Sequence, residues 1–384
     1  MQHARDGGHS KTCNGAVFEM KIFSNTPVVF LRGSPREQGV QYGELCRESI
    51  ASNLESLKGE HQEIFKKGVS PELYHAAVRR NREFVQRVSP ETIEEIEGIA
   101  EGSSCELEAL IDLNLMAYFA LRRLPAECSQ LLAESIGGPT RKYLAKTRDV
   151  GSPRMLQTVL HRTYDDRLQI AEVIHAGAIT SPGSGINSYG LAVSTSGVWG
   201  ADARYPASRA NEGWNLVNPH VWLRDCRTVN DLEAAVNVTD RLTAMNVVAA
   251  DSEASASFEV TPGSVIRTSS AGQGLALTNH CASPSLQGFS PSKDEYRSTY
   301  DRLDTLRSAL ASEAHWTLDD VLNTVRSHDG YPQSSICRHA LSDEDSLTIY
   351  ASVAVLPELE FYVMVGNPCE VPTDDLVQYE MKGN

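Results

Sequence analysis

Helix signals and strand signals occupy different parts of this chain, and that separation constrains its fold most strongly. Three times in the first hundred residues a serine precedes a proline and an early glutamate, at Ser34-Pro35, Ser70-Pro71 and Ser89-Pro90. A capping serine, a proline at the first helical position and an acid in the first turn are typical of a helix start. We therefore predict three helices before residue 105.

Short β-rich runs begin near residue 150. They alternate apolar and polar residues or are rich in β-branched residues, as strands are, and they cover 155–160, 170–175, 191–194, 245–249, 347–355 and 359–365. Helical stretches interrupt them at 230–237, 294–310 and 317–327. Because helices and strands are segregated, the pattern predicts an α+β protein rather than a doubly wound parallel sheet. No long Pro/Gly/Ser linker divides the chain, so we expect one compact unit with a helical N-terminal portion.

The net charge and the lengths of the apolar stretches argue against two classes of partner, nucleic acids and membranes. The 384 residues include 35 Lys+Arg and 50 Asp+Glu, a net charge of −15, and no dense basic run. Binding to nucleic acid is driven by clustered positive charge. No stretch approaches the roughly 20 apolar residues that span a bilayer. We predict neither a nucleic-acid partner nor a membrane partner.

The eight cysteines are scattered, at positions 13, 46, 105, 128, 226, 281, 337 and 369. There is no C-x-x-C pair and no closely spaced Cys/His cluster, so the spacing predicts no metal site and no disulfide scaffold. Residues 1–8 contain no apolar segment of a secretory signal, which favours a cytoplasmic protein with reduced thiols. Such cysteines are usually small buried hydrophobes. One of them can be a nucleophile, and composition does not identify it.

The loop at 183–190, GSGINSYG, is superficially similar to a phosphate-binding glycine loop. The third glycine of G-x-G-x-x-G is missing, and a strand-like run follows where a dinucleotide fold needs a helix. Glycine and asparagine also serve turns, because both tolerate positive φ. We interpret the loop as a turn between two strands.

A cysteine at the start of the β-rich region is followed by several short blocks in a fixed order. Glu127-Cys128 precedes Lys146-Thr147-Arg148-Asp149, Asn187-Ser188, Thr278-Asn279-His280 and Tyr331-Pro332 with Ile336-Cys337-Arg338. Together with the glycine-spaced helix entry at 33–43, this order resembles the acyl-CoA:6-aminopenicillanic acid acyltransferase family. These are self-processing N-terminal nucleophile hydrolases typified by fungal isopenicillin N acyltransferase, and insect β-alanyl-dopamine hydrolase is similar to them. The resemblance extends from about residue 33 to 368.

The resemblance implies a fold and a processing step. The fold would be the four-layer αββα sandwich. The precursor would be cut between Glu127 and Cys128, leaving a helical chain, 1–127, and a catalytic chain, 128–384, that stay associated. The new α-amine of Cys128, with a reference pKa of about 7.7–8.0, would act as the base for its own thiol. Relatives carry glycine where this chain has Glu127.

The resemblance also implies roles for other residues. Asn279 would donate its amide N–H to the oxyanion of the tetrahedral intermediate, and Asp149 would hold the amine and thiol of the nucleophile. Lys146 stands where relatives often carry arginine or glutamine, beside the substrate. Asn187 would line the substrate pocket or support the oxyanion site. Arg338 would either contact a substrate carboxylate or form a buried structural ion pair.

Three functions compete. In the first, Cys128 attacks a small N-acyl amide, an amine leaves and water releases the acyl group, without any cofactor. In the second, the same acyl-enzyme belongs to an acyl-CoA-dependent N-acyltransferase. The absence of a basic cluster suited to the CoA phosphates favours hydrolysis. The third is an unprocessed scaffold or binding protein in which Cys128 is inert.

Overall fold

A computed structural model of the chain describes residues 9–381, apart from 14–15, 24–25, 67, 117–126, 136–140, 152–153, 180–182, 201–204, 216–218, 313–314 and 343–344. The elements of the N-terminal portion are β1 (His9–Cys13), β2 (Ala16–Phe23), β3 (Thr26–Arg32), α1 (Pro35–Leu45), α2 (Arg47–Lys66), α3 (Pro71–Val88), α4 (Pro90–Ser103) and α5 (Leu107–Asn114). The elements that follow are β4 (Glu127–Glu134), β5 (Lys142–Val150), β6 (Gln157–Thr163), β7 (Gln169–His175), β8 (Ser184–Asn187), β9 (Ala192–Val198), α6 (Pro219–Asp225), α7 (Val229–Val238), β10 (Ala244–Ala250), β11 (Ser255–Thr261), β12 (Ser264–Ser269), β13 (Leu275–Leu277), α8 (Arg297–Ser312), α9 (Leu318–Val325), β14 (Leu347–Leu356), β15 (Glu360–Val365) and β16 (Val377–Glu380).

The three predicted helix starts are confirmed. Helices α1, α3 and α4 begin at Pro35, Pro71 and Pro90. Ser34 caps α1 in a capping box with Glu37, whose carboxylate accepts the backbone N–H of Ser34 at 2.8 Å. Helix α2 was not predicted, because it starts at Arg47 without a proline signal.

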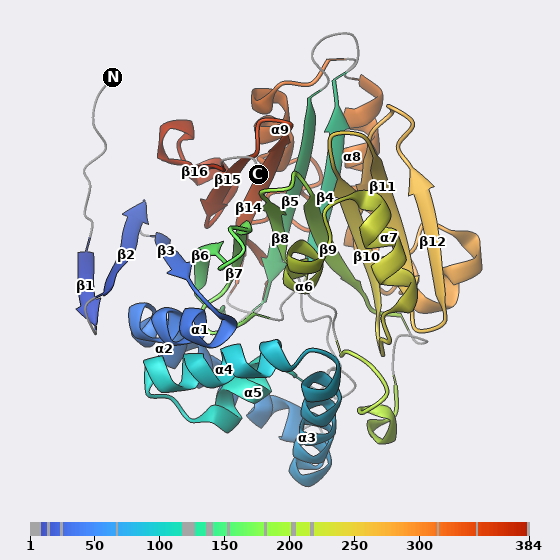
Figure 1. The fold of residues 1–384 in the computed structure, drawn as a ribbon. Helices are drawn as coiled ribbons and strands as arrows, with labels where there is room; N and C mark the ends of the chain where they lie inside the picture. Colours follow the sequence, from blue (N-terminus) through green and yellow to red (C-terminus); the bar gives the residue numbers. More distant parts are fainter. Residues whose placement is uncertain are drawn as a thin grey trace.

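The strands form two sheets (Figure 1). The larger has ten strands in the order β1-β2-β3-β6-β7-β8-β9-β10-β11-β12, and the smaller has six in the order β13-β4-β5-β14-β15-β16. Neighbours are antiparallel except β3 and β6, which pair in parallel with Val28 opposite Val159. The N-terminal portion therefore contributes strands as well as helices. The predicted turn is confirmed only for the second half of 183–190: Ser184–Asn187 form strand β8, and the turn to β9 follows, where Gly190 has a φ of +91°.

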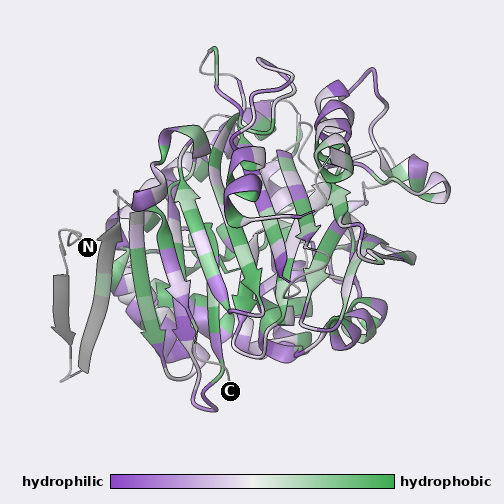
Figure 2. Cartoon of the chain, turned by 90° about the horizontal axis from the view of Figure 1, so that it is seen from above, coloured by the Kyte–Doolittle hydropathy of each residue, from purple (hydrophilic) through white to green (hydrophobic). Residues whose placement is uncertain are grey.

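Three apolar clusters separate four layers. The first lies between the larger sheet and helices α1–α7 and includes Ile50, Leu160 and Leu223. The second lies between the sheets, and the third joins the smaller sheet to α8 and α9 through Leu306 and Val321. Figure 2 shows hydrophobic stretches along the central strands and hydrophilic residues on many loops and outer helices. The layers are helices, sheet, sheet and helices, so the predicted αββα sandwich is confirmed.

A buried ion cluster connects the N-terminal helices to the larger sheet. The fully buried guanidinium of Arg162 on β6 donates to Glu95 on α4 at 2.5 Å and to Glu172 on β7 at 2.7 Å. It also donates to Gln38 on α1 at 3.3 Å. Buried charges are tolerated only when they are paired in this way. The helical layer is therefore fixed to the sheet by polar contacts as well as apolar ones.

Within the described part of the chain, no helix is both long and apolar enough to cross a bilayer. The cysteines whose side chains are described form no disulfide with one another. Residues 1–8, on which the expectation about a secretory signal depends, lie outside the described residues. The cytoplasmic location stays a prediction.

Candidate active site

The Glu127–Cys128 bond lies at the start of β4, the second strand of the smaller sheet. In the pairing of β4 with β5, Glu127 is opposite Asp149, Cys128 opposite Arg148 and Gln130 opposite Lys146. Successive side chains of a strand point to opposite faces. Gln130 bonds to β9 of the other sheet, whereas Leu131 packs against the α8 and α9 layer. Cys128 therefore faces the space between the sheets, and Glu127 faces α8.

The face between the sheets surrounds the Cys128 thiol with buried polar groups. Cys128 is 1 % exposed, and Lys146 is fully buried. The ammonium of Lys146 donates to the backbone oxygen of Thr195 on β9. Burial lowers the pKa of Lys146 to about 8, while the charge of Cys128 and a side-chain hydrogen bond with it act in the opposite direction. A cation next to a thiol stabilises its thiolate form, which is the nucleophile.

On the opposite face, two arginines hold the Glu127 carboxylate. Arg338 forms a close ion pair with it, and Arg302 on α8 lies at 3.4 Å. The fully buried Arg302 also donates to the backbone oxygen of Cys128 at 2.6 Å. Arg302 therefore contacts the residues on both sides of the Glu127–Cys128 bond.

Arg302 is a functional candidate that the sequence interpretation missed. Arg297 and Arg307 occupy the same helix, and nothing in the local pattern separates the three arginines. Burial does separate them, because Arg302 is fully buried while Arg297 and Arg307 are exposed. A burial pattern on α8 would have identified it, but that pattern is known only from the fold.

Asn279 lies at the nitrogen of the Glu127–Cys128 bond. Its Oδ1 accepts the backbone N–H of Cys128 at 2.7 Å and a guanidinium N–H of Arg302 at 3.1 Å. Its Nδ2 donates to the backbone oxygen of Gly197 at 3.0 Å. The amide oxygen thus faces the atom that would become an α-amine after cleavage. The oxyanion role predicted for the Nδ2 group stays a prediction.

Asp149, opposite Glu127 in the strand pairing, is buried, and within the described part of the chain only one of its two carboxylate oxygens is bonded. Its Oδ1 accepts from the hydroxyl of Thr348 on β14 at 2.7 Å. Its Oδ2 is buried and has no hydrogen-bond partner among the described residues. Burial raises the pKa of Asp149 to about 6, and the charge of Arg302 is the largest influence opposing that rise. An acceptor without a partner is costly in a protein interior, which makes Asp149 a candidate for holding another donor.

Asn187 is placed differently from the other candidates. Its Nδ2 donates to the backbone oxygens of Leu223 and Cys226, both at 2.8 Å. Its Oδ1 accepts the backbone N–H groups of Tyr189 and Leu191. The side chain ties the β8–β9 turn to α6, and these partners do not include the groups around Cys128. Its predicted contact with substrate stays a prediction.

Arg338 combines burial with an ion pair in the uncut chain. Besides Glu127, its guanidinium contacts the hydroxyl of Ser298 at 3.3 Å. Burial lowers the pKa of Arg338 to about 10. Of the two roles predicted for Arg338, the uncut chain contains the buried ion pair, and contact with a substrate carboxylate stays a prediction.

The four layers, with a buried cysteine at the start of a strand of the smaller sheet, have the architecture of the N-terminal nucleophile hydrolases. A profile of the family described as acyl-coenzyme A:6-aminopenicillanic acid acyl-transferase matches residues 137–370. The chain belongs to this family and is an enzyme of acyl transfer or amide hydrolysis. The matched segment contains Asp149, Asn187, Asn279 and Arg338 and begins after Cys128.

The chain was also compared with solved structures and with curated protein sequences. A penicillin V acylase structure from Agrobacterium tumefaciens is similar at 12% sequence identity, with a TM-score of 0.39, over 66% of this chain and 86% of that one. A search of curated protein sequences finds no match.

Proposed function

We propose that this protein is a self-processing cysteine amidohydrolase that cuts a small N-acyl amide through a Cys128 acyl-enzyme. The observation that carries the proposal is the arrangement around the Glu127–Cys128 bond. Asn279 accepts from its nitrogen, and Arg302 and Arg338 hold the Glu127 side chain. Burying these polar groups costs desolvation energy on folding, and active sites are where proteins commonly bear that cost.

Processing would begin as an acyl shift from nitrogen to sulfur. The Cys128 sulfur bonds to the carbonyl carbon of Glu127, the C–N bond breaks, and the thiol proton passes to the departing nitrogen. Water then hydrolyses the thioester, which gives a carboxylate on Glu127, a free thiol and an α-amine on Cys128. The two arginines fix the Glu127 side chain throughout these steps.

In the cut enzyme, the new amine has acceptors already in place. Asn279 Oδ1 faces the nitrogen, and Asp149 Oδ2 has no hydrogen-bond partner among the residues that the structure describes. Both acceptors favour an orientation that aims the lone pair of the amine at the thiol. The amine takes the thiol proton as sulfur attacks the substrate carbonyl, and it gives that proton to the leaving amine. Water then releases the acyl group from the thioester.

The ion pair of Arg338 suggests that the substrate carries a carboxylate. In the uncut chain its partner is a carboxylate, that of Glu127. Withdrawal of the cut end would leave the guanidiniums of Arg302 and Arg338 free to bind a carboxylate on the substrate. We expect the cut enzyme to hydrolyse a glutaryl amide faster than the pentanoyl amide of the same amine. Equal kcat/KM values for the two amides would leave Arg338 as a structural ion pair.

The second candidate is an acyl-CoA-dependent N-acyltransferase, favoured by the description of the matched family. It uses the same acyl-enzyme and differs in donor and acceptor. The test offers purified cut enzyme a panel of N-acyl amides, and separately acyl-CoA with and without amines. We expect amide hydrolysis to be the faster reaction. Release of CoA that requires an amine and outpaces amide hydrolysis would establish the transferase instead.

A further inference from the structure

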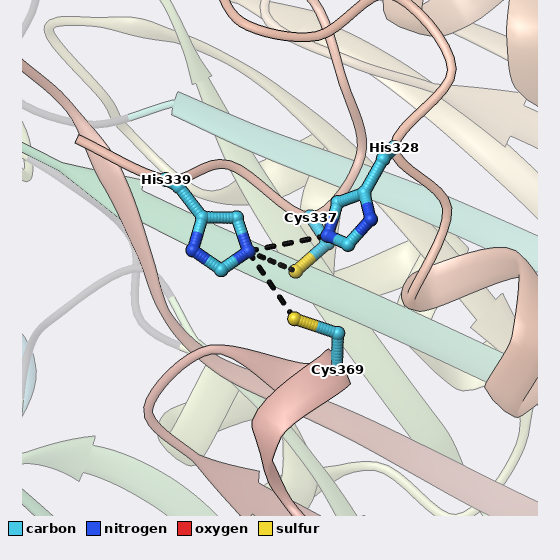
Figure 3. A group of neighbouring side chains, drawn as sticks. All are labelled: His328, Cys337, His339 and Cys369. Atoms are coloured by element: carbon cyan, nitrogen blue, oxygen red, sulfur yellow. Dashed lines mark hydrogen bonds between the residues drawn. The ribbon is translucent and has the colours of Figure 1, made fainter. Parts of the chain in front are cut away.

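Four metal-binding side chains from two segments of the chain, 328–339 and the loop at Cys369, meet at one point of the fold (Figure 3). They are His328, Cys337, His339 and Cys369, and their ligand atoms all lie within 4.8 Å of one another. Nε2 of His339 is 3.1 Å from Nε2 of His328, 3.9 Å from Sγ of Cys337 and 3.2 Å from Sγ of Cys369. The spacing along the chain predicted no such cluster.

Hydrogen bonding alone does not account for this arrangement. An imidazole nitrogen carries either one N–H or one lone pair, so Nε2 of His339 cannot bond to three neighbours at once. A cation at the centre accepts a lone pair from all four ligands. The cluster therefore has the chemistry of a metal site rather than that of a hydrogen-bonded network.

The three distances from Nε2 of His339 are close to those of a tetrahedral zinc site. Bonds of about 2.3 Å to sulfur and about 2.0–2.1 Å to nitrogen place the ligand atoms of a tetrahedron about 3.3–3.8 Å apart. The three distances from Nε2 of His339 lie within about 0.2 Å of that range. Two thiolates and two imidazoles are a frequent donor set for structural zinc and disfavour magnesium and calcium, which prefer oxygen.

The surroundings of the cluster support the ligands. Nδ1 of His339 faces a carboxylate oxygen of Glu370 at 3.8 Å, longer than a direct hydrogen bond, on the side of the ring away from the cluster. A carboxylate at the second ring nitrogen is the common way to orient a metal-bound histidine. Asn367 donates to the backbone oxygen of Arg338 at 2.5 Å, which joins the two chain segments that supply the cysteines.

We propose that His328, Cys337, His339 and Cys369 bind a zinc ion in a closed structural site. Four protein ligands leave no open position for substrate or water, so the ion would act on structure and not on chemistry. Cys337 and His339 flank Arg338, whose guanidinium holds the Glu127 carboxylate. The ion would thereby fix the Arg338 segment beside the Glu127–Cys128 bond. This last consequence rests on the proposed function, whereas zinc binding itself does not.

The test measures zinc retained by the full-length protein. The wild type is incubated with Zn²⁺ in reducing buffer and desalted, and its zinc is measured by plasma mass spectrometry. We expect one zinc per chain, and Co²⁺ in its place should give the absorption of tetrahedral thiolate-bound cobalt. Cys337→Ala/Cys369→Ala should retain none. The matched control, Cys46→Ala/Cys226→Ala, removes two buried cysteines elsewhere and should retain one per chain.

A second variant is needed because the double cysteine variant would also lose zinc if it misfolded. His328 is exposed, so His328→Ala should fold normally and lose zinc to a competing chelator at least about tenfold more readily than the wild type. The proposal is overturned if the wild type retains no zinc, or if the cysteine and histidine variants retain as much as the control. A disulfide between Cys337 and Cys369 in the zinc-treated wild type would overturn it as well.

Discussion

At the scale of single residues, Arg302 joins three groups of the candidate site. Its guanidinium contacts the Glu127 carboxylate, the backbone oxygen of Cys128 and the Asn279 amide oxygen. It is fully buried, so its removal takes away bonds that bulk solvent does not reach in the native fold. Loss of one partner from a buried charge pair costs about 3–5 kcal/mol.

We therefore predict that Arg302→Gln lowers the free energy of unfolding by about 3–5 kcal/mol and slows cleavage of the Glu127–Cys128 bond. Arg307→Gln, at an exposed position of the same helix, should change stability by less than about 0.5 kcal/mol. Urea unfolding measures the first effect, and the rate of appearance of the two fragments measures the second. Unaltered stability and cleavage in Arg302→Gln would refute the role assigned to this arginine.

Asp149 leads to a prediction about pH. Burial raises the pKa of Asp149 to about 6, whereas an unfolded aspartate has a pKa of about 3.9. Between these values the folded state holds a proton that the unfolded state has lost. The contribution of Asp149 to the free energy of unfolding should therefore fall as pH rises from about 4 to about 6, by about 3 kcal/mol in total.

Asp149→Asn should remove this contribution, because an amide does not titrate and keeps an acceptor for Thr348. The measurement is urea unfolding from pH 4 to pH 7, with and without Asp149→Asn, both in a Cys128→Ala background that stays uncut. The difference between the two curves isolates Asp149 from the other carboxylates. Parallel curves would show that Asp149 titrates normally.

At the scale of secondary-structure elements, the closest packing joins α1 to α4. Gly39 and Gly43 of α1 meet Gly98 and Gly102 of α4, and a methyl group added at any of the four would overlap backbone atoms of the other helix. The glycine spacing seen in the sequence at 33–43 thus has a packing reason. The two helix backbones touch because no side chain stands between them.

We predict that Gly102→Ala lowers the free energy of unfolding by about 1–3 kcal/mol or more, because the helices must move apart. Gly59 lies exposed in α2 with no atom within 4 Å of an added methyl group, so Gly59→Ala should stabilise the protein by up to about 1 kcal/mol. Thermal and urea unfolding of both variants measure the difference. A destabilisation of equal size in both would mean that close packing of α1 on α4 is not the cause.

The same scale shows which elements a sequence can predict. The helices with capping serines were predicted correctly, and each of the six predicted strand runs overlaps a strand, but β3 and β11 were missed although both contain apolar residues. Strands β4 and β5 were not, because their buried positions carry polar residues such as Gln130, Lys146 and Asp149. Hydropathy patterns assume that buried positions are apolar, and active sites violate that assumption. Polar residues at buried positions therefore hid the two strands that carry Cys128 and Asp149.

At the scale of the whole molecule, contacts between distant segments assemble the site. Arg302 and Cys128 are 174 residues apart, and Cys369 lies 30 residues beyond His339. Neither pair produces a local spacing signal. The resemblance to a family predicted the αββα layers and the candidates Cys128 and Asn279, but the position of Arg302 and the Cys/His cluster depend on how the layers fold together.

The layers also predict what happens after cleavage. The segment 1–127 supplies strand β3 to the larger sheet and Glu95 to the buried Arg162 cluster, and its helices cover one face of that sheet. We expect the fragments 1–127 and 128–384 to elute together in size-exclusion chromatography under native conditions and to separate only in denaturant. Separate elution in native buffer would contradict this account of the fold.

The central claim is that Cys128 cuts the chain before itself and becomes the catalytic nucleophile. Denaturing mass spectrometry of the purified protein, with Cys128→Ala as the comparison, tests it most directly. We predict two wild-type fragments, one ending at Glu127 and one beginning at Cys128, and a single 384-residue chain in an inactive Cys128→Ala variant. A wild type that stays intact, together with unaltered function in Cys128→Ala, would contradict the claim and leave this chain as a binding protein with an inert cysteine.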